Sequence, residues 1–214
     1  MPPATRQIKA IIFDFGGVLV DWNPHYLYRS FLPNDDAIDN FLSEIGFVEW
    51  NQEQDRGRSF AEGVADLTAR YPHHSDLIRA YDERWEESIG GPIQPTVEIL
   101  RELKQAGYAL YGLSNWSAET FQRVREKFQF FGWFETIVLS GDVRLIKPDP
   151  QIYRLVLEKT NLSAEECLFI DDSATNIEAA NRLGFKTIRF VSPEQLAAEL
   201  AQLKILPQAQ KRSK

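Results

Sequence analysis

Several residues that can do chemistry stand at the ends of short apolar segments of this chain. Asp14 ends the first segment, Ser114 ends the second, and the adjacent pair Asp171 and Asp172 comes at the end of the fourth. Lys147 lies in the loop after the third segment. If the fold brings them together, these carboxylates, the hydroxyl and the lysine form a site for a divalent cation beside an anion.

The apolar segments themselves predict strands of a parallel sheet. They are rich in β-branched and aromatic residues, and the last four are separated by helical patterns. For example, Val97, Leu100 and Leu103 lie on one face of a predicted helix, and Gly107 follows as its C-terminal cap. This alternation indicates an α/β fold with helices on both faces of the sheet, where ligands bind beyond the carboxyl ends of the strands. The predicted strands are residues 8–14, 108–114, 136–140, 167–171 and 186–191.

The region between the first and second predicted strands is long and helical. Ile38, Leu42 and Ile45 recur there at helical spacing, and no strand comparable to the others is expected. The Gly-Gly-Pro sequence at residues 90–92 ends the region and is predicted to act as a hinge. We therefore predict a catalytic core at residues 1–21 and 93–206, a helical bundle inserted as a cap at residues 22–92, and a flexible tail at residues 207–214.

Length, charge and cysteine content narrow the function classes. The chain has 214 residues and a net charge of −7, which argues against nucleic acid or an anionic membrane as the main partner. Its single cysteine, Cys167, allows neither an intrachain disulfide nor a cysteine-based metal cluster. No apolar segment approaches the roughly 18 residues of a membrane span, and no secretory leader is evident. We expect a cytoplasmic monomer or homodimer with a small-molecule partner and no nucleic acid or membrane partner.

Four segments of the chain resemble, in order, the four sequence motifs of the haloacid dehalogenase-like hydrolase superfamily. They read FDFGGVLVDWNP, LSNWS, KPDPQIY and LFIDDSATNIEAANRLGF, and the resemblance covers residues 6–206. It implies a Rossmann-like core, and the helical insertion resembles the C1-type cap of that superfamily. The first motif is similar to those of bacterial phosphatases that act on α-glucose 1-phosphate and to those of 2-haloacid dehalogenases.

The resemblance and the positions of the residues together suggest catalytic and phosphate-binding roles. Asp14 is expected to attack phosphorus and form an acyl-phosphate, although a lone aspartate here also suits a turn cap. Ser114 and Asn115 are expected to hold phosphate oxygens, unless the serine simply ends its strand. Trp116 is expected to line the substrate side. Lys147, by default a solvated side chain, is expected to neutralise the nucleophile and the transferred group.

The adjacent pair Asp171 and Asp172 predicts a Mg²⁺ site. Two carboxylates at the end of a buried strand are costly to desolvate without a cation, and Mg²⁺ removes that cost. The alternative, a doubly capped helix N-terminus, accounts for one carboxylate but not for two. The superfamily's pattern implies that Asp172 is a direct ligand and Asp171 an outer one, together with Asp14 and the carbonyl of Gly16. Asn176 is expected to support the metal-bound waters or to orient the lysine.

One position departs from the phosphatase pattern of the superfamily. Many of its phosphatases have a second aspartate two residues after the nucleophile, which protonates the leaving group and later activates water, but this chain has Gly16 there. General acid–base help of this kind is commonly worth about 10²–10⁴-fold in rate. The candidates for a replacement, which the sequence does not rank, are Asp21, His25, Glu53, Asp55, Arg56 and Arg58.

We therefore expect a Mg²⁺-dependent phosphomonoester hydrolase that acts on a small phosphorylated metabolite, in particular a sugar phosphate such as glucose 1-phosphate, through an aspartyl-phosphate. Two alternatives stay open, namely a metal-independent 2-haloacid dehalogenase and a weakly active or inactive binding or regulatory protein on the same fold. Dehalogenases carry neutral residues at the acidic pair of the fourth motif, so Asp171 and Asp172 favour phosphate over halide. Elsewhere, the neighbouring His73 and His74 are expected to face different ways in a solvated loop.

Overall fold

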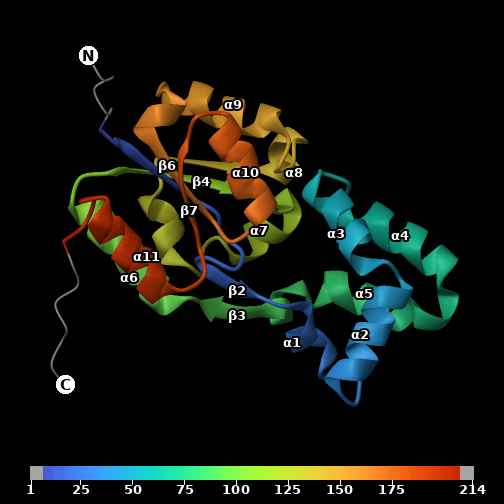
Figure 1. Cartoon of the computed structure of the whole chain (residues 1–214). Helices are drawn as coiled ribbons and strands as arrows, with labels where there is room; N and C mark the ends of the chain where they lie inside the picture. Colours follow the sequence, from blue (N-terminus) through green and yellow to red (C-terminus); the bar gives the residue numbers. More distant parts are fainter. Residues whose placement is uncertain (1–6, 208–214) are drawn as a thin grey trace, which may run out of the picture.

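A five-stranded parallel sheet forms the centre of the molecule (Figure 1). The structure is a computed structural model and describes residues 7–207. The strand order is β5-β4-β1-β6-β7, so that the first strand of the chain lies in the middle of the sheet. The predicted α/β fold and parallel sheet are confirmed, with strands at β1 (Ala10–Phe13), β4 (Ala109–Ser114), β5 (Thr136–Leu139), β6 (Cys167–Asp171) and β7 (Lys186–Arg189).

Helices cover both faces of this sheet because its central strand is apolar on both sides. Successive side chains of a strand point to opposite faces, so Ile11 and Phe13 join one apolar cluster while Ala10 and Ile12 join another. The first cluster includes residues of α6 (Gln94–Gln105) and α11 (Pro193–Gln202), and the second includes residues of α9 (Pro150–Thr160) and α10 (Ala174–Arg182). Shorter helices complete the connections, namely α7 (Ala118–Val124), η3 (Gln129–Trp133), α8 (Ser140–Val143) and η4 (Ala164–Glu166).

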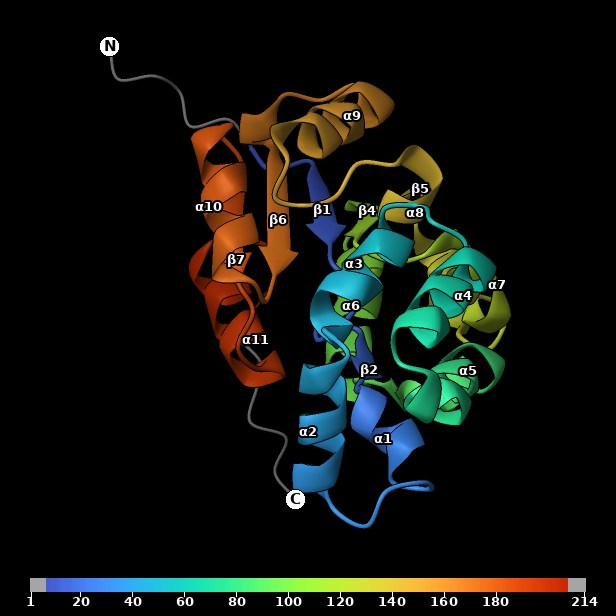
Figure 2. The same ribbon diagram turned by 90° about the vertical axis from the view of Figure 1, so that its right-hand side faces the viewer.

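The helical insertion follows β1 and lies beyond the carboxyl edge of the sheet, as Figures 1 and 2 show. Its helices pack on one another around buried aromatic rings, including those of Trp50, Phe60 and Tyr81. Ser59 and Glu62 form the capping box that begins α4. The helices are α1 (Pro24–Tyr28), α2 (Asp35–Glu44), α3 (Phe47–Asp55), α4 (Phe60–Arg70), η1 (Pro72–His74), α5 (Ser75–Glu83) and η2 (Trp85–Ser88).

An antiparallel two-stranded ribbon joins the insertion to the core. It consists of β2 (Val20–Trp22) and β3 (Ile89–Pro92), so the expectation that residues 22–92 contain no strand is wrong at their end. Glycine and proline disfavour strands locally, but pairing with β2 outweighs that preference. A Cβ at Gly90 would displace the Asp21 carboxylate and the Tyr26 ring, which are hydrogen-bonded to each other, so glycine suits this position of the ribbon. The predicted division at residues 22 and 92 stays a prediction, and residues 208–214 of the predicted tail lie outside the described part.

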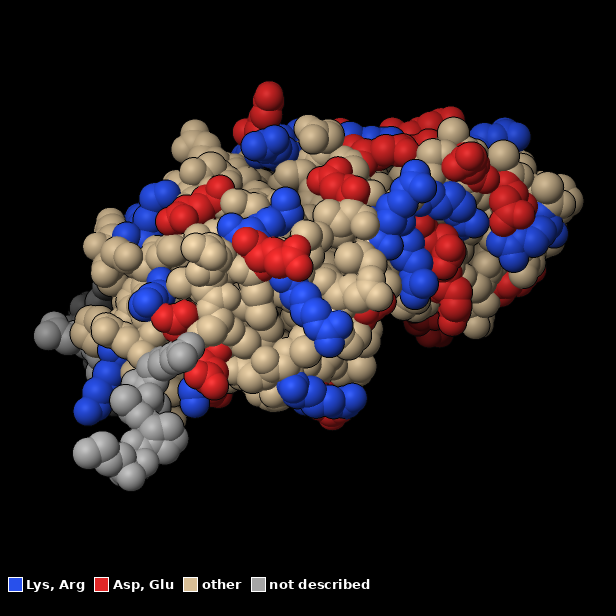
Figure 3. All heavy atoms as spheres, turned by 90° about the horizontal axis from the view of Figure 1, so that it is seen from above, with Lys and Arg blue, Asp and Glu red and all other residues tan. Residues whose placement is uncertain are grey.

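The surface carries both signs of charge. On the face seen in Figure 3, Lys and Arg side chains alternate with Asp and Glu, and no broad area of one sign appears there. Among residues 7–207, no helix has the length and apolar character that crossing a membrane requires.

Candidate active site

The buried ammonium of Lys147 connects the ends of three neighbouring strands. Its Nζ lies 2.9 Å from Oδ2 of Asp14, which follows β1, and 2.7 Å from Oδ2 of Asp171, which ends β6. It also donates to the carbonyl of Leu113 in β4 at 2.9 Å. These contacts occupy all three of its donors, and the side chain is 1% exposed. Burial opposes the charge, but Asp14 and Asp171 outweigh it and raise the pKa of Lys147.

Asp14 directly follows β1, and both of its carboxylate oxygens have partners. Its Oδ1 accepts the N–H of Phe15 at 2.7 Å, and its other oxygen faces Lys147. Burial raises the pKa of Asp14, and Asp171 adds to the effect against the opposing charge of Lys147. The carboxylate is therefore held in place on both oxygens and is short of positive charge.

The two carboxylates of the acidic pair have different surroundings. Asp171 is fully buried, and it accepts from Lys147, from the N–H of Ser173 at 2.8 Å and from Nδ2 of Asn176 at 3.0 and 3.1 Å. Asp172 is exposed, and its carboxylate lies against the loop after Asp14. Asn176 thus holds Asp171 directly, while Asp172 keeps oxygens available for a ligand.

The three carboxylates suit a divalent cation. Each of Asp14, Asp171 and Asp172 offers one oxygen, and these oxygens lie within 4.8 Å of one another. Lys147 pairs with Asp14 and Asp171, and Arg189 donates to the backbone carbonyl of Asp172, so within residues 7–207 the Asp172 carboxylate has no ion pair of its own. Hard oxygen donors with this excess charge are the ligand set that Mg²⁺ takes.

The backbone of the turn after Asp14 favours glycine at position 17, and the Asp172 carboxylate lies close to it. Gly17 has a φ of +71°, and a Cβ there would lie 2.6 Å from Oδ2 of Asp172. At Gly16, by contrast, a Cβ would meet no atom within 4 Å. The contact between Gly17 and Asp172 joins the turn after β1 to the end of the neighbouring strand β6, 155 residues later in the chain.

The predicted phosphate-binding residues lie at the same edge but differ in what their groups contact. Ser114 is buried at the end of β4. The side chain of Asn115 donates to the carbonyl of Lys147 at 3.0 Å and accepts its N–H at 2.8 Å, so it holds the lysine loop. The N–H of Trp116 donates to Oγ of Ser140 at 2.9 Å, and its indole donates to Thr120. Trp116 is thus held by both of its N–H groups, and its side chain packs against the rings of Trp85 and Phe121.

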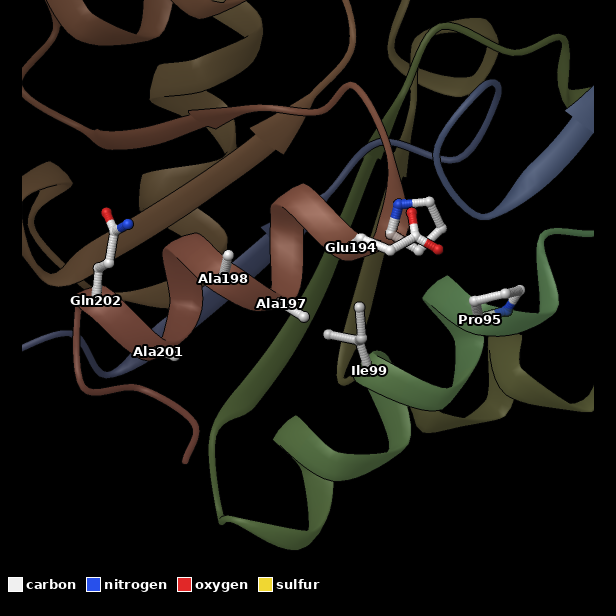
Figure 4. A pocket seen from close by; sticks show the side chains of 8 residues that line it. Pro95, Ile99, Glu194, Ala197, Ala198, Ala201 and Gln202 are labelled. Carbon is white, nitrogen blue, oxygen red and sulfur yellow. The ribbon is translucent and has the colours of Figure 1, made fainter. Parts of the chain in front are cut away.

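A cavity of about 80 Å³ lies between this edge and the insertion. Its lining comes from the core and from the insertion, and apart from Gly16 it consists of polar and aromatic side chains. The residues are Gly16, Trp22, Asn51, Asp55, Phe60, Tyr81, Trp85, Asn115, Trp116 and Thr120. A larger open groove of about 610 Å³ lies between α6 and α11 (Figure 4), but Ala197, Ala198, Ala201 and Ile99 supply much of its lining, and none of the predicted site residues does. The smaller cavity, by contrast, is lined by three of the predicted site residues, namely Gly16, Asn115 and Trp116.

Five of the six candidate acid–base residues do not line this cavity. Most of them have partners of their own elsewhere: Asp21 accepts from Tyr26 at 2.8 Å, His25 lies between Asp35 and Asp39, Glu53 faces Arg56 at the surface, and Arg58 donates to Gln54. Asp55 is the sixth, and it does line the cavity.

Asp55 reaches the core from the last residue of α3. Its Oδ1 accepts the N–H of Ser117 at 3.1 Å, and its Oδ2 accepts from Nδ2 of Asn51 at 3.2 Å. Burial raises the pKa of Asp55 to about 8, the Ser117 N–H opposes this, and the charge of Asp14 adds to it. No local motif distinguishes Asp55 from its neighbours, because its partner Ser117 lies 62 residues away.

His73 and His74 differ from the expectation that they face different ways. Both rings turn to Glu44, whose oxygens lie 3.0 and 3.1 Å from the two Nε2 atoms. These contacts lower the pKa of Glu44, the His73 contact most. The group is largely solvent-exposed and lies at the far end of α2, so the two histidines take no part in the site at the sheet edge.

The chain belongs to the haloacid dehalogenase-like hydrolases, because the model of that family matches residues 8–184. It is 29% identical to the sesquiterpene phosphatase astK of Aspergillus oryzae over 91% of this chain and 96% of that protein. It is 23% identical to (S)-2-haloacid dehalogenase 4A of Burkholderia cepacia, over 86% and 83% of the two chains. A HAD family enzyme of Bacteroides thetaiotaomicron, solved with magnesium and inorganic phosphate, has the same fold, with 24% identity, a TM-score of 0.63 and coverage of 85% and 93%.

The close approach of Gly17 to Asp172 predicts the effect of a single methyl group. Gly17→Ala combines a positive φ with a Cβ too close to the carboxylate, and we expect it to lower the free energy of unfolding by about 1–3 kcal/mol. Gly132→Ala is the control, since its Cβ meets no atom within 4 Å, and it should change stability by less than about 1 kcal/mol. Urea unfolding measures both, and equal stabilities of the two variants would contradict the described turn.

The raised pKa of Asp55 predicts a pH-dependent contribution to stability. Asp55 has a pKa of about 8 in the folded chain and 3.8 in the unfolded chain. Between these two values the folded chain keeps the proton and the unfolded chain loses it, so the free energy of unfolding falls as the pH rises toward about 8. We expect the stability of the wild type relative to Asp55→Asn to fall by about 1–3 kcal/mol between pH 5 and pH 8. Urea unfolding at several pH values measures this, and Glu53→Gln, an exposed acid of the same helix, is the control. Parallel curves for wild type and Asp55→Asn would refute the assignment.

Proposed function

We propose that this enzyme is a Mg²⁺-dependent phosphomonoester hydrolase whose nucleophile is Asp14. The observation that carries the proposal is the meeting of Asp14, Asp171 and Asp172 with the single ammonium of Lys147 at the carboxyl edge of the sheet. A dianionic phosphate needs a cationic site, and the charge excess of this site calls for a divalent ion. A dehalogenase needs no such ion, because halide leaves carbon as a weakly basic anion.

In the proposed reaction, Asp14, Lys147, Ser114 and Asn115 have separate roles. Asp14 attacks phosphorus, the bond to the leaving oxygen breaks, and water later cleaves the aspartyl-phosphate. Lys147 holds Asp14 in place and offsets the charge of the transferred group. Ser114 and the neighbouring backbone N–H of Asn115 contact the phosphoryl oxygens, while the Asn115 side chain keeps the lysine loop in position.

The cation-binding residues are Asp14, Asp172 and the carbonyl of Gly16, with Asp171 in an outer position. The full set of hydrogen bonds to Asp171 supports that outer role, and the exposed Asp172 supports the direct one. When bound, Mg²⁺ supplies positive charge beside the phosphoryl oxygens. The solved HAD family enzyme with magnesium and inorganic phosphate supports the same pairing of ion and ligand.

The substrate class that we favour is a small phosphorylated metabolite, in particular a sugar phosphate such as glucose 1-phosphate. The cavity beside Gly16 is lined by aromatic rings and by the polar residues Asn51, Asp55 and Thr120, a mixed lining that suits a sugar ring with its apolar and polar sides. The similarity to a sesquiterpene phosphatase makes an isoprenyl monophosphate the informative comparison. Both classes leave the reaction at Asp14 unchanged and differ only in what the cavity holds.

The nucleophile assignment predicts the effect of one isosteric substitution. Asp14→Asn removes the attacking carboxylate, and we expect it to lower phosphate release by at least about 10³-fold. A panel of sugar, isoprenyl and aryl phosphates with Mg²⁺ measures release by the wild type and the variant. Asp76→Asn, whose side chain is 95% exposed in the insertion, is the matched control and should keep full activity. Wild-type turnover by Asp14→Asn would disprove the assignment.

Metal removal separates the phosphatase from the dehalogenase. After dialysis against a chelator we expect phosphate release to stop and to return when Mg²⁺ is added, because the acidic site then lacks its counter-charge. Chloride release from 2-chloropropionate should be absent with and without the metal. Chloride release that survives the chelator would establish the dehalogenase instead, and inactivity on every ester and haloacid would favour a binding protein.

A further inference from the structure

If the chain is the proposed phosphatase, on which this inference rests, the oxygen that leaves phosphorus needs a proton from a nearby group. The position two residues after Asp14 is Gly16, which has no side chain to donate a proton. A Cβ at Gly16 would meet nothing within 4 Å, so the space where a second carboxylate could stand is open. The same glycine lines the cavity between the sheet edge and the insertion.

Asp55 is the single carboxylate among the residues that line this cavity. It ends α3 of the insertion and accepts the N–H of Ser117, three residues after the end of β4. The other polar lining groups are amides and hydroxyls, which do not exchange protons readily near neutral pH. The cavity thus has an empty position on the core side and one carboxylate on the insertion side.

The carboxyl group of Asp55 is held in a defined orientation. Ser117, just after the predicted phosphate-binding residues, donates its N–H to Oδ1, and Asn51 donates to Oδ2. Asn51 is itself held by the hydroxyl of Tyr81, at 3.1 Å from its Oδ1. Close packing keeps α3 near the core, since a Cβ at Gly57 would lie 2.8 Å from the carbonyl of Gly141.

We propose that Asp55, supplied by the insertion, is the general acid and base that replaces the carboxylate absent at Gly16. In the first step Asp14 attacks phosphorus and the bond to the leaving oxygen breaks. That oxygen keeps the electron pair and takes the proton of Asp55. In the second step the Asp55 carboxylate takes a proton from water, the water oxygen bonds to phosphorus, and the electron pair returns to Asp14. Inorganic phosphate leaves, and Asp55 is again protonated.

The protonation state of Asp55 suits this role near neutral pH. Its pKa of about 8 keeps the acid form populated for the first step and makes the carboxylate a competent base for the second. The titratable groups that act on it are Asp14 after β1 and Tyr81 on α5, and Arg144, the residue after α8, packs beside the neighbouring Gly57. Asp14 favours the protonated form of Asp55, and Ser117 favours the ionised form.

Leaving-group dependence tests the proposal. Glucose 1-phosphate needs a proton on its leaving oxygen, whereas p-nitrophenolate leaves without one. We expect Asp55→Asn to lower turnover of glucose 1-phosphate by about 10²–10⁴-fold. With p-nitrophenyl phosphate, the variant should give a burst of p-nitrophenol close to one per enzyme and then turn over slowly, because the second step still lacks its base. Glu53→Gln, an exposed acid two residues away, is the matched control and should behave as wild type.

A second substitution tests whether the two positions share one role. Because the space at Gly16 is open, Gly16→Asp in the Asp55→Asn background should recover at least about ten-fold of the lost rate on glucose 1-phosphate. Circular dichroism checks folding, and Asp55→Ser, which keeps an oxygen acceptor for the Ser117 N–H, replaces Asp55→Asn if that variant is unfolded.

The outcomes separate the two proposals. Wild-type rates for folded Asp55→Asn, or equal losses on both esters without a burst, would overturn the role of Asp55 while leaving the phosphatase intact. A wild-type enzyme that releases phosphate from neither ester would overturn both proposals. A burst with p-nitrophenyl phosphate, lost turnover of glucose 1-phosphate and rescue by Gly16→Asp would support both.

Discussion

The buried ammonium of Lys147 is the interaction on which the rest of the site depends. A charge this deep in a protein costs several kcal/mol unless it is paired and hydrogen-bonded, and Asp14, Asp171 and the Leu113 carbonyl together meet that requirement. These partners come from β1, β6 and β4, which are neighbours in the sheet. The strand order that places β1 in the middle is therefore also what makes the charge tolerable, so fold and site depend on each other.

Two asparagines keep this arrangement rigid, and neither needs to touch a substrate with its side chain. The Asn115 side chain hydrogen-bonds to the backbone N–H and the backbone carbonyl of Lys147, and Asn176 donates to both oxygens of Asp171. Their hydrogen bonds hold the lysine and the outer carboxylate in position before any ligand arrives, which lowers the reorganisation that catalysis would otherwise require. Asp172 is left comparatively free, and this difference distinguishes two residues that are identical in the sequence.

The insertion completes the site through a few close contacts with the core. Asp55 accepts the N–H of Ser117, the N–H of Phe60 donates to Glu119, and the rings of Trp85 and Trp116 lie 5.8 Å apart. These contacts enclose the cavity next to Gly16 with groups from both parts of the chain. A change in the position of the insertion would alter the cavity and the environment of Asp55 together, because both depend on the same contacts with the core.

The sequence by itself determined the five strands and the helical insertion, because hydrophobic periodicity is a local signal. The alternation of strands and helices implies a parallel sheet, and this places Asp14, Lys147 and Asp171 at one edge. The sequence did not reveal β3, whose Gly-Gly-Pro sequence pairs only because β2 lies opposite. Nor did it separate Asp55 from five other candidates, or show that two adjacent histidines turn to the same glutamate. Those features depend on contacts between segments distant in the chain, and the free energy of such contacts is decided by packing in three dimensions.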